Sequence, residues 1–330
     1  MLLLSQDQNL VYLLIGFGPH LRIGKRVSRE LELVSPITEK EILLQFKGNI
    51  SSDPYNILAS WELKSLRILT LFGFKFSGEI PEVYGGIDSL WKINISSNAF
   101  SGSIPEFLGD LPNIRFLDLS RNMYSGEIPV GLVYLSVRNN ALSGLVQEQV
   151  KPCQRLELLD LGSNKFSGWA PFGVLELVNL TYFNVSSNGF EGKIVESGTC
   201  SQRLEVLDVS RNNFFGEIPL SISKCSTLNY LDMAYNRISG SIPTELEDLK
   251  SLSVIRLGNN SLGGTIPAEL GSIEWLAVLD PHSLTLFGEI PYEISNCKLL
   301  LQLRQGMTAF YWERSVEGGS SAVKQMIGIF

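Results

Sequence analysis

The sequence predicts a repeat solenoid. Segments that begin with leucine or isoleucine recur every 24 residues over most of the chain. Asparagine, glycine and an Ile-Pro pair keep the same place in these segments, which the period of amphipathic helices does not produce. Leucines spaced by two lie on one side of a short strand and cannot be buried by one unit alone. The units must therefore stack into a shared core.

The repeats share a leading leucine or isoleucine. They begin at Leu66, Leu90, Ile114, Leu132, Leu156, Leu180, Leu204, Leu228, Leu252 and Leu276. The fourth of these units is short, because it begins 18 residues after Ile114, and an eleventh unit from Leu300 ends after Leu303. We expect the most regular part of the solenoid to lie between Leu156 and Ile290.

Each position of the unit Leu228–Pro243 has a physical interpretation. Leu231 and Met233 alternate and should point into the core. Asn236 follows the strand, where its amide can bond backbone groups that have no ladder partner. Gly240 permits a bend that a Cβ would oppose. The asparagines in this register predict a stacked ladder of amides at Asn98, Asn122, Asn140, Asn164, Asn188, Asn212, Asn236 and Asn260.

Composition excludes several classes of function. The net charge of −7 at pH 7, with no basic stripe, argues against nucleic acid as a partner. Two histidines and four scattered cysteines leave little material for a metal site, and no cofactor is expected. No stretch approaches the roughly 20 apolar residues of a membrane helix. At the N-terminus, polar Gln6–Asn9 interrupts the apolar run, so the sequence leaves open whether a signal peptide works.

The Gly-x-Ile-Pro motif resembles that of plant-type leucine-rich repeats. It is intact at Gly78–Pro81, Gly102–Pro105, Gly126–Pro129, Gly216–Pro219, Gly240–Pro243, Gly264–Pro267 and Gly288–Pro291. The resemblance is greatest to ectodomains of plant leucine-rich-repeat receptor-like kinases. It implies a right-handed superhelix with a concave parallel β-sheet and an irregular or 3-10 convex side.

The resemblance also implies a division of the chain. We expect a degenerate leader over residues 1–34, a partial helical N-terminal cap over 35–62, leucine-rich repeats over 63–303 and a non-repeat tail over 304–330. The cap segment Glu39–Trp61 is similar to that of the receptors, but the paired cysteines that follow it in the family are missing. The kinase motifs are also missing, so the chain is not expected to be an enzyme. These departures predict a truncated, internally deleted or misassembled gene product.

Outward positions on the predicted strands supply a candidate binding face, the usual binding surface of a solenoid. Aromatic residues precede the inner leucines, aspartates lie between the two inner apolar positions, and arginines lie nearby, with Asp280, His282 and Arg121 in related positions. Tyrosine and arginine are common anchors for protein partners. The alternative is that the aspartates belong to a generic strand pattern and are only solvated. The candidate residues are Phe116, Asp118, Tyr134, Arg138, Asp160, Tyr182, Asp208, Arg211, Tyr230, Asp232, Tyr235 and Arg256.

Two kinds of covalent modification are also predicted. Sequons for N-glycosylation occur at Asn49, Asn94, Asn179, Asn184 and Asn259. Asn179 is the best placed of these, since it ends a convex segment. Cys200 and Cys225 lie one repeat apart with an offset of one residue. They can approach to bonding distance in an oxidising compartment, and the alternative is that they are free buried thiols.

Three functions remain open. The resemblance implies an extracellular or cell-surface module of a receptor-like protein, which binds a peptide ligand or a protein partner such as a co-receptor in signal transduction. The second is a secreted inhibitor of a wall-degrading enzyme, which the absence of a membrane helix and a kinase would fit. The third is a gene remnant with no function, since an uncapped solenoid exposes its apolar end.

Overall fold

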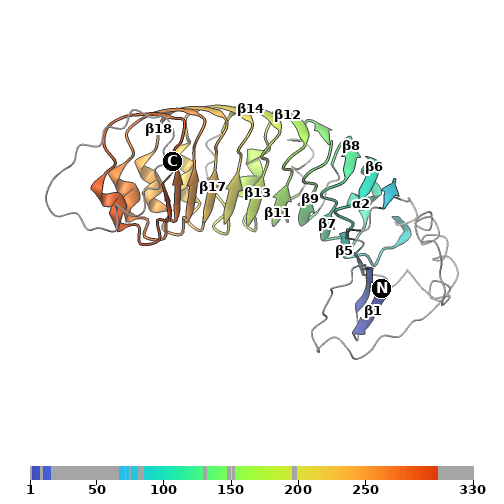
Figure 1. Cartoon of the computed structure of the whole chain (residues 1–330). Helices are drawn as coiled ribbons and strands as arrows, with labels where there is room; N and C mark the ends of the chain where they lie inside the picture. The colour runs from blue at the N-terminus through green and yellow to red at the C-terminus, as the bar shows by residue number, and fades with distance from the viewer. Residues whose placement is uncertain are drawn as a thin grey trace. The chain divides into compact units, whose positions relative to one another are not determined.

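The computed structural model describes residues 2–7, 10–15, 67–70, 72–73, 76–80, 85–128, 132–146, 150, 153–194 and 199–303. The predicted cap over 35–62, the tail over 304–330 and the sequon at Asn49 lie outside the described residues. The chain divides into two compact units, Met1–Ser143 and Gly144–Phe330. Each unit is built from coils that carry short parallel strands (Figure 1), and the leucine-rich-repeat solenoid predicted from the sequence is confirmed.

The unit Met1–Ser143 contains two sets of strands. The first set is β1 (Leu2–Asp7), β2 (Leu10–Ile15), β3 (Ile68–Thr70), β5 (Lys92–Asn94), β7 (Phe116–Asp118) and β9 (Tyr134–Ser136). β1 and β2 pair antiparallel, and the pairs from β2 to β9 are parallel. The second set is β4 (Ser77–Gly78), β6 (Ala99–Ser103) and β8 (Met123–Ser125). A single helical turn, α2 (Phe107–Asp110), buries Leu108.

The unit Gly144–Phe330 is more regular. Its first sheet is parallel and contains β11 (Leu158–Asp160), β13 (Tyr182–Asn184), β15 (Val206–Asp208), β17 (Tyr230–Asp232), β19 (Val254–Arg256), β21 (Val278–Asp280) and β23 (Gln302–Leu303). Its second set of strands is β12 (Lys165–Trp169), β14 (Gly189–Lys193), β16 (Asn213–Gly216), β18 (Arg237–Ser241), β20 (Ser261–Gly264) and β22 (Thr285–Leu286). The short β10 (Ser143–Gly144) spans the boundary between the units.

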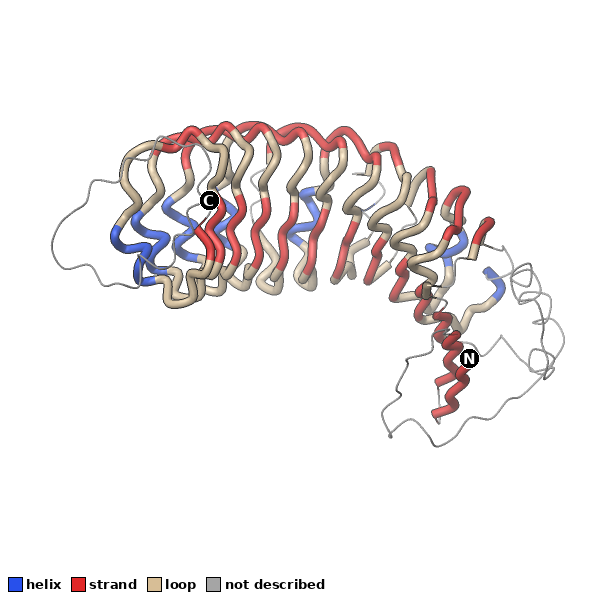
Figure 2. The backbone as a smooth tube through the Cα atoms, in the orientation of Figure 1, coloured by secondary structure: helices blue, strands red, loops and turns tan. Residues whose placement is uncertain are grey.

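Short 3-10 helices complete the coils of this unit (Figure 2). They are η5 (Phe172–Glu176), η6 (Leu220–Lys224), η7 (Thr244–Asp248), η8 (Ala268–Ser272) and η9 (Tyr292–Asn296). In the last four, the proline that closes an Ile-Pro pair precedes the helix with extended backbone. The expected 3-10 side is therefore present, whereas the second set of strands was not predicted. Among the described residues, no helix has the length and apolar character needed to cross a membrane.

The inward leucines and the asparagine ladder behave as the sequence predicts. Leu231 and Met233 are completely buried. At Asn212, Oδ1 accepts the backbone N–H of Phe190 at 3.1 Å, and Nδ2 donates to three carbonyl oxygens at 2.9–3.2 Å. The carbonyls belong to two successive coils, so each amide joins its coil to the preceding one. The ladder ends where Leu284, which is 4% exposed, takes the position of the next asparagine.

The turn before each ladder position uses a left-handed backbone conformation that the sequence analysis did not predict. L-residues pay a steric cost for this conformation, and Asn tolerates it better than bulky residues. Among the described residues, the non-glycine positions with φ between 53° and 57° are Ser97, Arg121, Asn139, Ser163, Ser187, Arg211, Tyr235, Asn259 and Ser283. The bend predicted at Gly240 is present, with φ of 83°.

Candidate functional site

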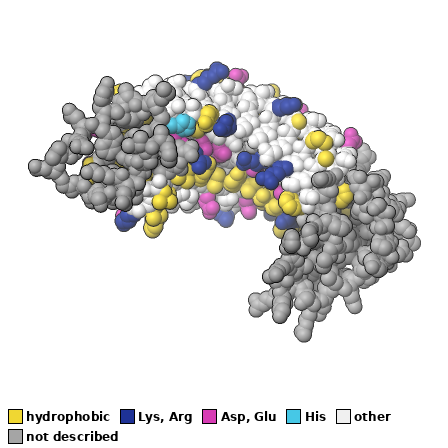
Figure 3. All heavy atoms as spheres, viewed as in Figure 1, with side chains coloured by type: hydrophobic (Ala, Val, Ile, Leu, Met, Phe, Trp, Pro, Cys, Tyr) yellow, Lys and Arg dark blue, Asp and Glu magenta, His cyan; other side chains and the backbone are white. Residues whose placement is uncertain are grey.

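The outward side chains of the first-sheet strands form the surface that we call the strand face, considered separately for β5–β9 and for β11–β21. Its first row includes Phe116, Tyr134, Tyr182 and Tyr230, all of which are half-buried. In Figure 3, apolar side chains form a band beside which acidic and basic side chains gather. The predicted mixture of aromatic and charged groups is therefore present on the strand face of each unit.

The aspartates of the second row do not form the solvated column that the sequence analysis gave as the alternative to a binding face. Asp160, Asp232 and Asp280 are only 8%, 8% and 4% exposed, while Asp118 and Asp208 are half-buried. In all five, the carboxylate Oδ1 accepts the backbone N–H two residues later at 3.0–3.4 Å. These short turns pull the carboxylates toward the backbone, because the N–H after each strand has no ladder partner there. The row is mainly structural, and Asp160 and Asp280 contribute little accessible charge.

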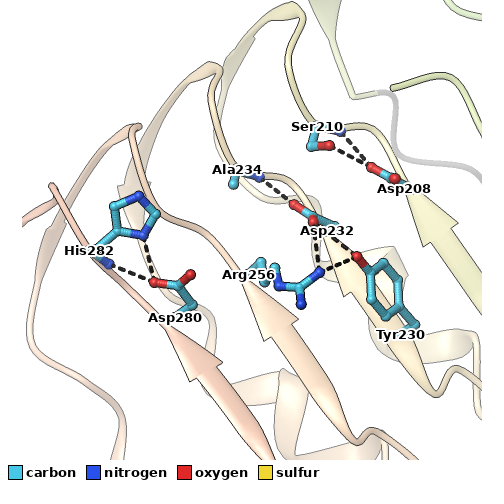
Figure 4. A network of polar contacts seen from close by, with 8 residues as sticks. All are labelled: Asp208, Ser210, Tyr230, Asp232, Ala234, Arg256, Asp280 and His282. Atoms are coloured by element: carbon cyan, nitrogen blue, oxygen red, sulfur yellow. Dashed lines mark hydrogen bonds and ion pairs between the residues drawn. The ribbon is translucent and has the colours of Figure 1, made fainter. Parts of the chain in front are cut away.

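Tyr230, Asp232 and Arg256 form a polar network on β17 and β19 (Figure 4). The Tyr230 hydroxyl donates to Asp232 Oδ2 at 3.1 Å, and Arg256 Nη1 lies 3.5 Å from the same oxygen. Arg256 also donates to the Tyr230 hydroxyl oxygen and lies over the Tyr230 ring, 5.4 Å from its centroid. Asp208 is the register partner of Asp232 on β15. The structure thus brings together four residues that the sequence singled out separately.

The environment of this network favours the neutral form of its acids. Burial raises the pKa of Asp232, and the nearby Asp208 carboxylate raises it further. The Ala234 N–H, the Tyr230 hydroxyl and the Arg256 guanidinium act in the opposite direction without cancelling the effect. Burial, followed by the Asp232 and Asp208 charges, likewise raises the pKa of Tyr230. The Arg256 guanidinium therefore stabilises the ionised form of Asp232, which burial and the Asp208 carboxylate disfavour.

A second cluster lies along the turns that follow β15, β17 and β21. The Arg211 guanidinium lies 4.1 Å from the centroid of the Tyr235 ring. The His282 ring also contacts Tyr235, and the two ring centroids are 5.9 Å apart. His282 Nδ1 contacts the Asp280 carboxylate, and its Nε2 contacts the Asn259 side-chain amide. This cluster brings together Arg211 and Tyr235, two residues of the predicted binding face, and His282.

The sequence analysis missed the roles of Asn259 and Gly258 in this cluster. A Cβ at Gly258 would lie 2.2 Å from His282 Nδ1, so the absence of a side chain there makes room for the ring. The available signal was the succession of small residues at this position in neighbouring repeats, which Gly258 continues and His282 interrupts.

In the unit Met1–Ser143, the strand face carries a different cluster. Phe116 and Tyr134 are stacked with their ring centroids 3.8 Å apart, and Lys92 Nζ lies 4.1 Å from the Phe116 centroid. Arg138 is half-buried in the turn after β9. Tyr182, in the other unit, accepts a hydrogen bond from Asn184 Nδ2 at 3.3 Å and is separated from Tyr230 by Val206. Val206 therefore interrupts the aromatic residues of the first row, as the sequence itself indicates.

The structure separates the sequons by accessibility. Asn184 is completely buried, and its Oδ1 accepts the Ser186 N–H at 2.8 Å. A glycan on this side chain is incompatible with the fold, so the predicted site at Asn184 is wrong. Asn94, Asn179 and Asn259 are half-buried. The Asn179 Oδ1 accepts a hydrogen bond from Arg203 at 3.2 Å, a contact that leaves Nδ2 available for a glycan.

Cys200 and Cys225 are joined by a disulfide with a Cα–Cα distance of 5.2 Å. The alternative of two free thiols is therefore not what the structure shows for this pair. Cys153 and Cys297 are buried and lie outside this disulfide, and burial raises the pKa of the Cys297 thiol. Across the described residues, no group of three or more His, Cys, Asp or Glu side chains is arranged to hold a metal ion.

Comparison with known proteins places these features in context. Family models described as leucine-rich repeats match residues 202–262 and 89–111. The crystal structure of PEPR1 with AtPEP1 is similar, with 32% identity, a TM-score of 0.67 and coverage of 75% of this chain and 39% of that chain. A TDR receptor structure has 29% identity and a TM-score of 0.69, with coverage of 74% and 44%.

The ectodomain of the Arabidopsis receptor kinase HAESA, in complex with an extended IDA peptide hormone, is 26% identical with a TM-score of 0.63. That match covers 75% of this chain and 46% of the HAESA chain. The chain thus spans less than half the length of each of these three receptor structures.

Proposed function

Because this chain is a leucine-rich-repeat protein of the kind that forms plant receptor ectodomains, we propose that its strand face over β11–β21 binds an extended peptide. The observation that carries the proposal is the arrangement of Tyr230 with the Asp232–Arg256 pair on β17 and β19, with Tyr182 two strands away in the same row of outward residues. These aromatic rings are half-buried and outward, and the pair supplies directional hydrogen bonds. Rigid tyrosines next to an arginine are frequent anchors of protein recognition.

The comparisons support a peptide in preference to other partners. The PEPR1 structure is a complex with AtPEP1, and the HAESA structure is a complex with a peptide hormone. A protein partner, such as a co-receptor, would bind the same chain through another surface or beside the peptide.

We place this recognition outside the cell. The Cys200–Cys225 disulfide is of the kind that persists in oxidising compartments. Asn179 offers an amide that is accessible to a glycan. Mass spectrometry of the chain purified from a plant secretory system should find a glycan at Asn179 and an unmodified Asn184. A chain retained inside plant cells with reduced cysteines would contradict the extracellular assignment.

The binding proposal is tested by selection from a display library of random dodecapeptides on the full chain. We expect enriched peptides to bind at least about tenfold more weakly to a Tyr182→Ser variant, because truncating an aromatic anchor at a binding hot spot costs about 2 kcal/mol or more. The matched control is Trp169→Ser, which truncates another exposed aromatic residue, 57% exposed on β12 of the second set of strands.

The control should leave peptide affinity unchanged, since Trp169 lies off the strand face. Circular dichroism melting of both variants separates loss of binding from loss of fold. The proposed function is wrong if the library yields no binder. It is equally wrong if the Tyr182→Ser variant binds the selected peptides as tightly as the Trp169→Ser control and the unmodified chain do.

A further inference from the structure

We propose that Arg211 and Tyr235, with His282 behind them, form a subsite for an acidic side chain of the bound peptide. We call these three residues the cationic ledge. The inference rests on the proposed function, which it deepens by naming the chemistry of one ligand side chain.

Arg211 is distinguished by the lack of a charge partner. It is exposed, and its guanidinium lies over the Tyr235 ring. Within the described part of the chain, no carboxylate forms an ion pair with Arg211. Arg256, by contrast, is paired with Asp232 on the adjoining strands. A guanidinium held over the face of a ring still has N–H groups available, and their fork geometry matches the two oxygens of a carboxylate.

The backbone supplies an independent indication. Arg211 and Tyr235 have φ of 54° and 57°. The other repeats of this unit place Ser or Asn in the same left-handed position, as at Ser187 and Asn259. A large side chain raises the steric cost there, and an exposed cation–π contact offsets it only in part. Strain of this kind is typical of positions that are kept for recognition rather than for stability.

The ledge is also held rigidly in place. Tyr235 is 42% exposed and lies between the Arg211 guanidinium and the His282 ring. Contacts with Asp280 and Asn259 fix the two nitrogens of that ring, which occupies the space above Gly258. A site whose side chains are already ordered loses little entropy when a ligand binds.

The position of the ledge suits a ligand that lies along the strand face. Arg211 and Tyr235 follow Asp208 and Asp232 by three residues at the ends of β15 and β17. Parallel strands are about 4.8 Å apart, so the ledge and the Tyr230 network lie within reach of one extended peptide.

The test uses asparagine substitutions, because asparagine accepts the left-handed backbone. We expect Arg211→Asn and Tyr235→Asn to melt at the same temperature as the unmodified chain or a few degrees higher. Both should weaken the binding of library-selected dodecapeptides, Arg211→Asn by at least about tenfold. The selected peptides should share Asp or Glu at one position. Ser163→Asn places asparagine in the same left-handed register two repeats before Arg211 and should leave binding unchanged.

A double-mutant cycle then identifies the contact. Replacing the shared acidic residue by its amide should weaken binding to the unmodified chain by about tenfold and have little effect on binding to Arg211→Asn. Equal losses in both chains, or selected peptides without a shared acid, would show that the ledge is not an acidic subsite, while a weakened Tyr182→Ser variant would still support the proposed function. If Tyr182→Ser has no effect either, the proposed function itself fails.

Discussion

The two units carry outward aromatic residues in the same register but surround them with different charges. On β5–β9, Lys92 lies over Phe116, which stacks on Tyr134. On β17 and β19, the aromatic residue is Tyr230, and its hydroxyl joins a buried carboxylate to Arg256. The backbone of the repeat is therefore constant, and the side chains in the outward positions decide the electrostatics of each strand face.

A second contrast lies in the core. One buried position of the repeat holds an aromatic ring in several coils and an aliphatic side chain in others, such as Ile238 and Leu262. The buried aromatic residues at this position are Phe76, Phe100 and Tyr124 in the first unit and Phe166, Phe190 and Phe214 in the second. The Tyr124 hydroxyl has no hydrogen-bond partner among the described residues. Among these six aromatic residues, Tyr124 of the first unit therefore carries an unpaired polar atom, whereas the three of the second unit are phenylalanines.

The largest expected effect comes from the asparagine ladder, which both units share. Asn122 and Asn212 make equivalent contacts, with one backbone N–H donated to Oδ1 and three carbonyls accepting from Nδ2. Asn212 is 8% exposed, while Asn122 is half-buried. Asn212→Ala should lower the free energy of unfolding by about 4 kcal/mol, because it leaves several buried backbone groups unpaired.

Asn122→Ala should cost about half as much, since water can replace part of its hydrogen bonding. Urea unfolding monitored by circular dichroism, with hydrogen exchange to assign the loss to a unit, gives both values. Equal losses would show that the difference in burial between the two units has no energetic consequence.

The disulfide should produce the next largest difference between the units. It closes a sequence separation of 25 residues in the second unit. Replacing both Cys200 and Cys225 by Ser should lower the free energy of unfolding by about 3 kcal/mol, through the greater entropy of the unfolded chain. Hydrogen exchange should increase in the repeats around β15 and β17. An increase confined to the unit Met1–Ser143 would contradict the expectation.

Exchanging Tyr and Phe at the buried aromatic position tests how much the unpaired Tyr124 hydroxyl costs in stability. Tyr124→Phe removes an unpaired buried hydroxyl and should raise the free energy of unfolding by about 1 kcal/mol. The reverse change, Phe166→Tyr, should lower it by about 1–3 kcal/mol, because it introduces such a hydroxyl into the other unit. Thermal and urea unfolding of the two variants would measure both signs. A stabilised Phe166→Tyr variant would show that this core has a partner for the hydroxyl.

The smallest expected effect is a pH dependence. The pKa of Asp232 is raised in the folded state. The folded chain therefore binds more protons than the unfolded chain between the ordinary Asp pKa of about 3.9 and the raised value, and stability falls as pH increases through that window. Asp232→Asn should remove this decline and be at least as stable as the unmodified chain at pH 7.

Arg256→Gln provides the opposite test, because it removes the cation that favours the ionised form of Asp232. Its decline in stability with pH should be steeper than that of the unmodified chain. Urea unfolding between pH 4 and pH 7 measures all three slopes. A decline of the same size in Asp232→Asn would assign the pH dependence to another group.

Much of the fold followed from the order of residues. The period, the alternation of Leu231 with Met233 and the register of Asn236 predicted the strands, the buried leucines and the amide ladder, because these are local patterns that a single repeat displays. The second set of strands and the left-handed turns were not predicted. Both depend on how a coil is held by its neighbours, which no single repeat reveals.

For the candidate site, the sequence by itself determined which side chains point outward, since alternation along a strand decides that. Only the tertiary structure decided which of them carry accessible charge. Asp232 and Asp280 are outward by register, yet backbone N–H groups two residues later draw them in and bury them. The contact between Tyr235 and His282 likewise depends on Gly258, whose missing side chain lets a ring from the next repeat fill the space. Such contacts arise between stacked coils, where burial and hydrogen bonding, rather than residue type, decide the role of a side chain.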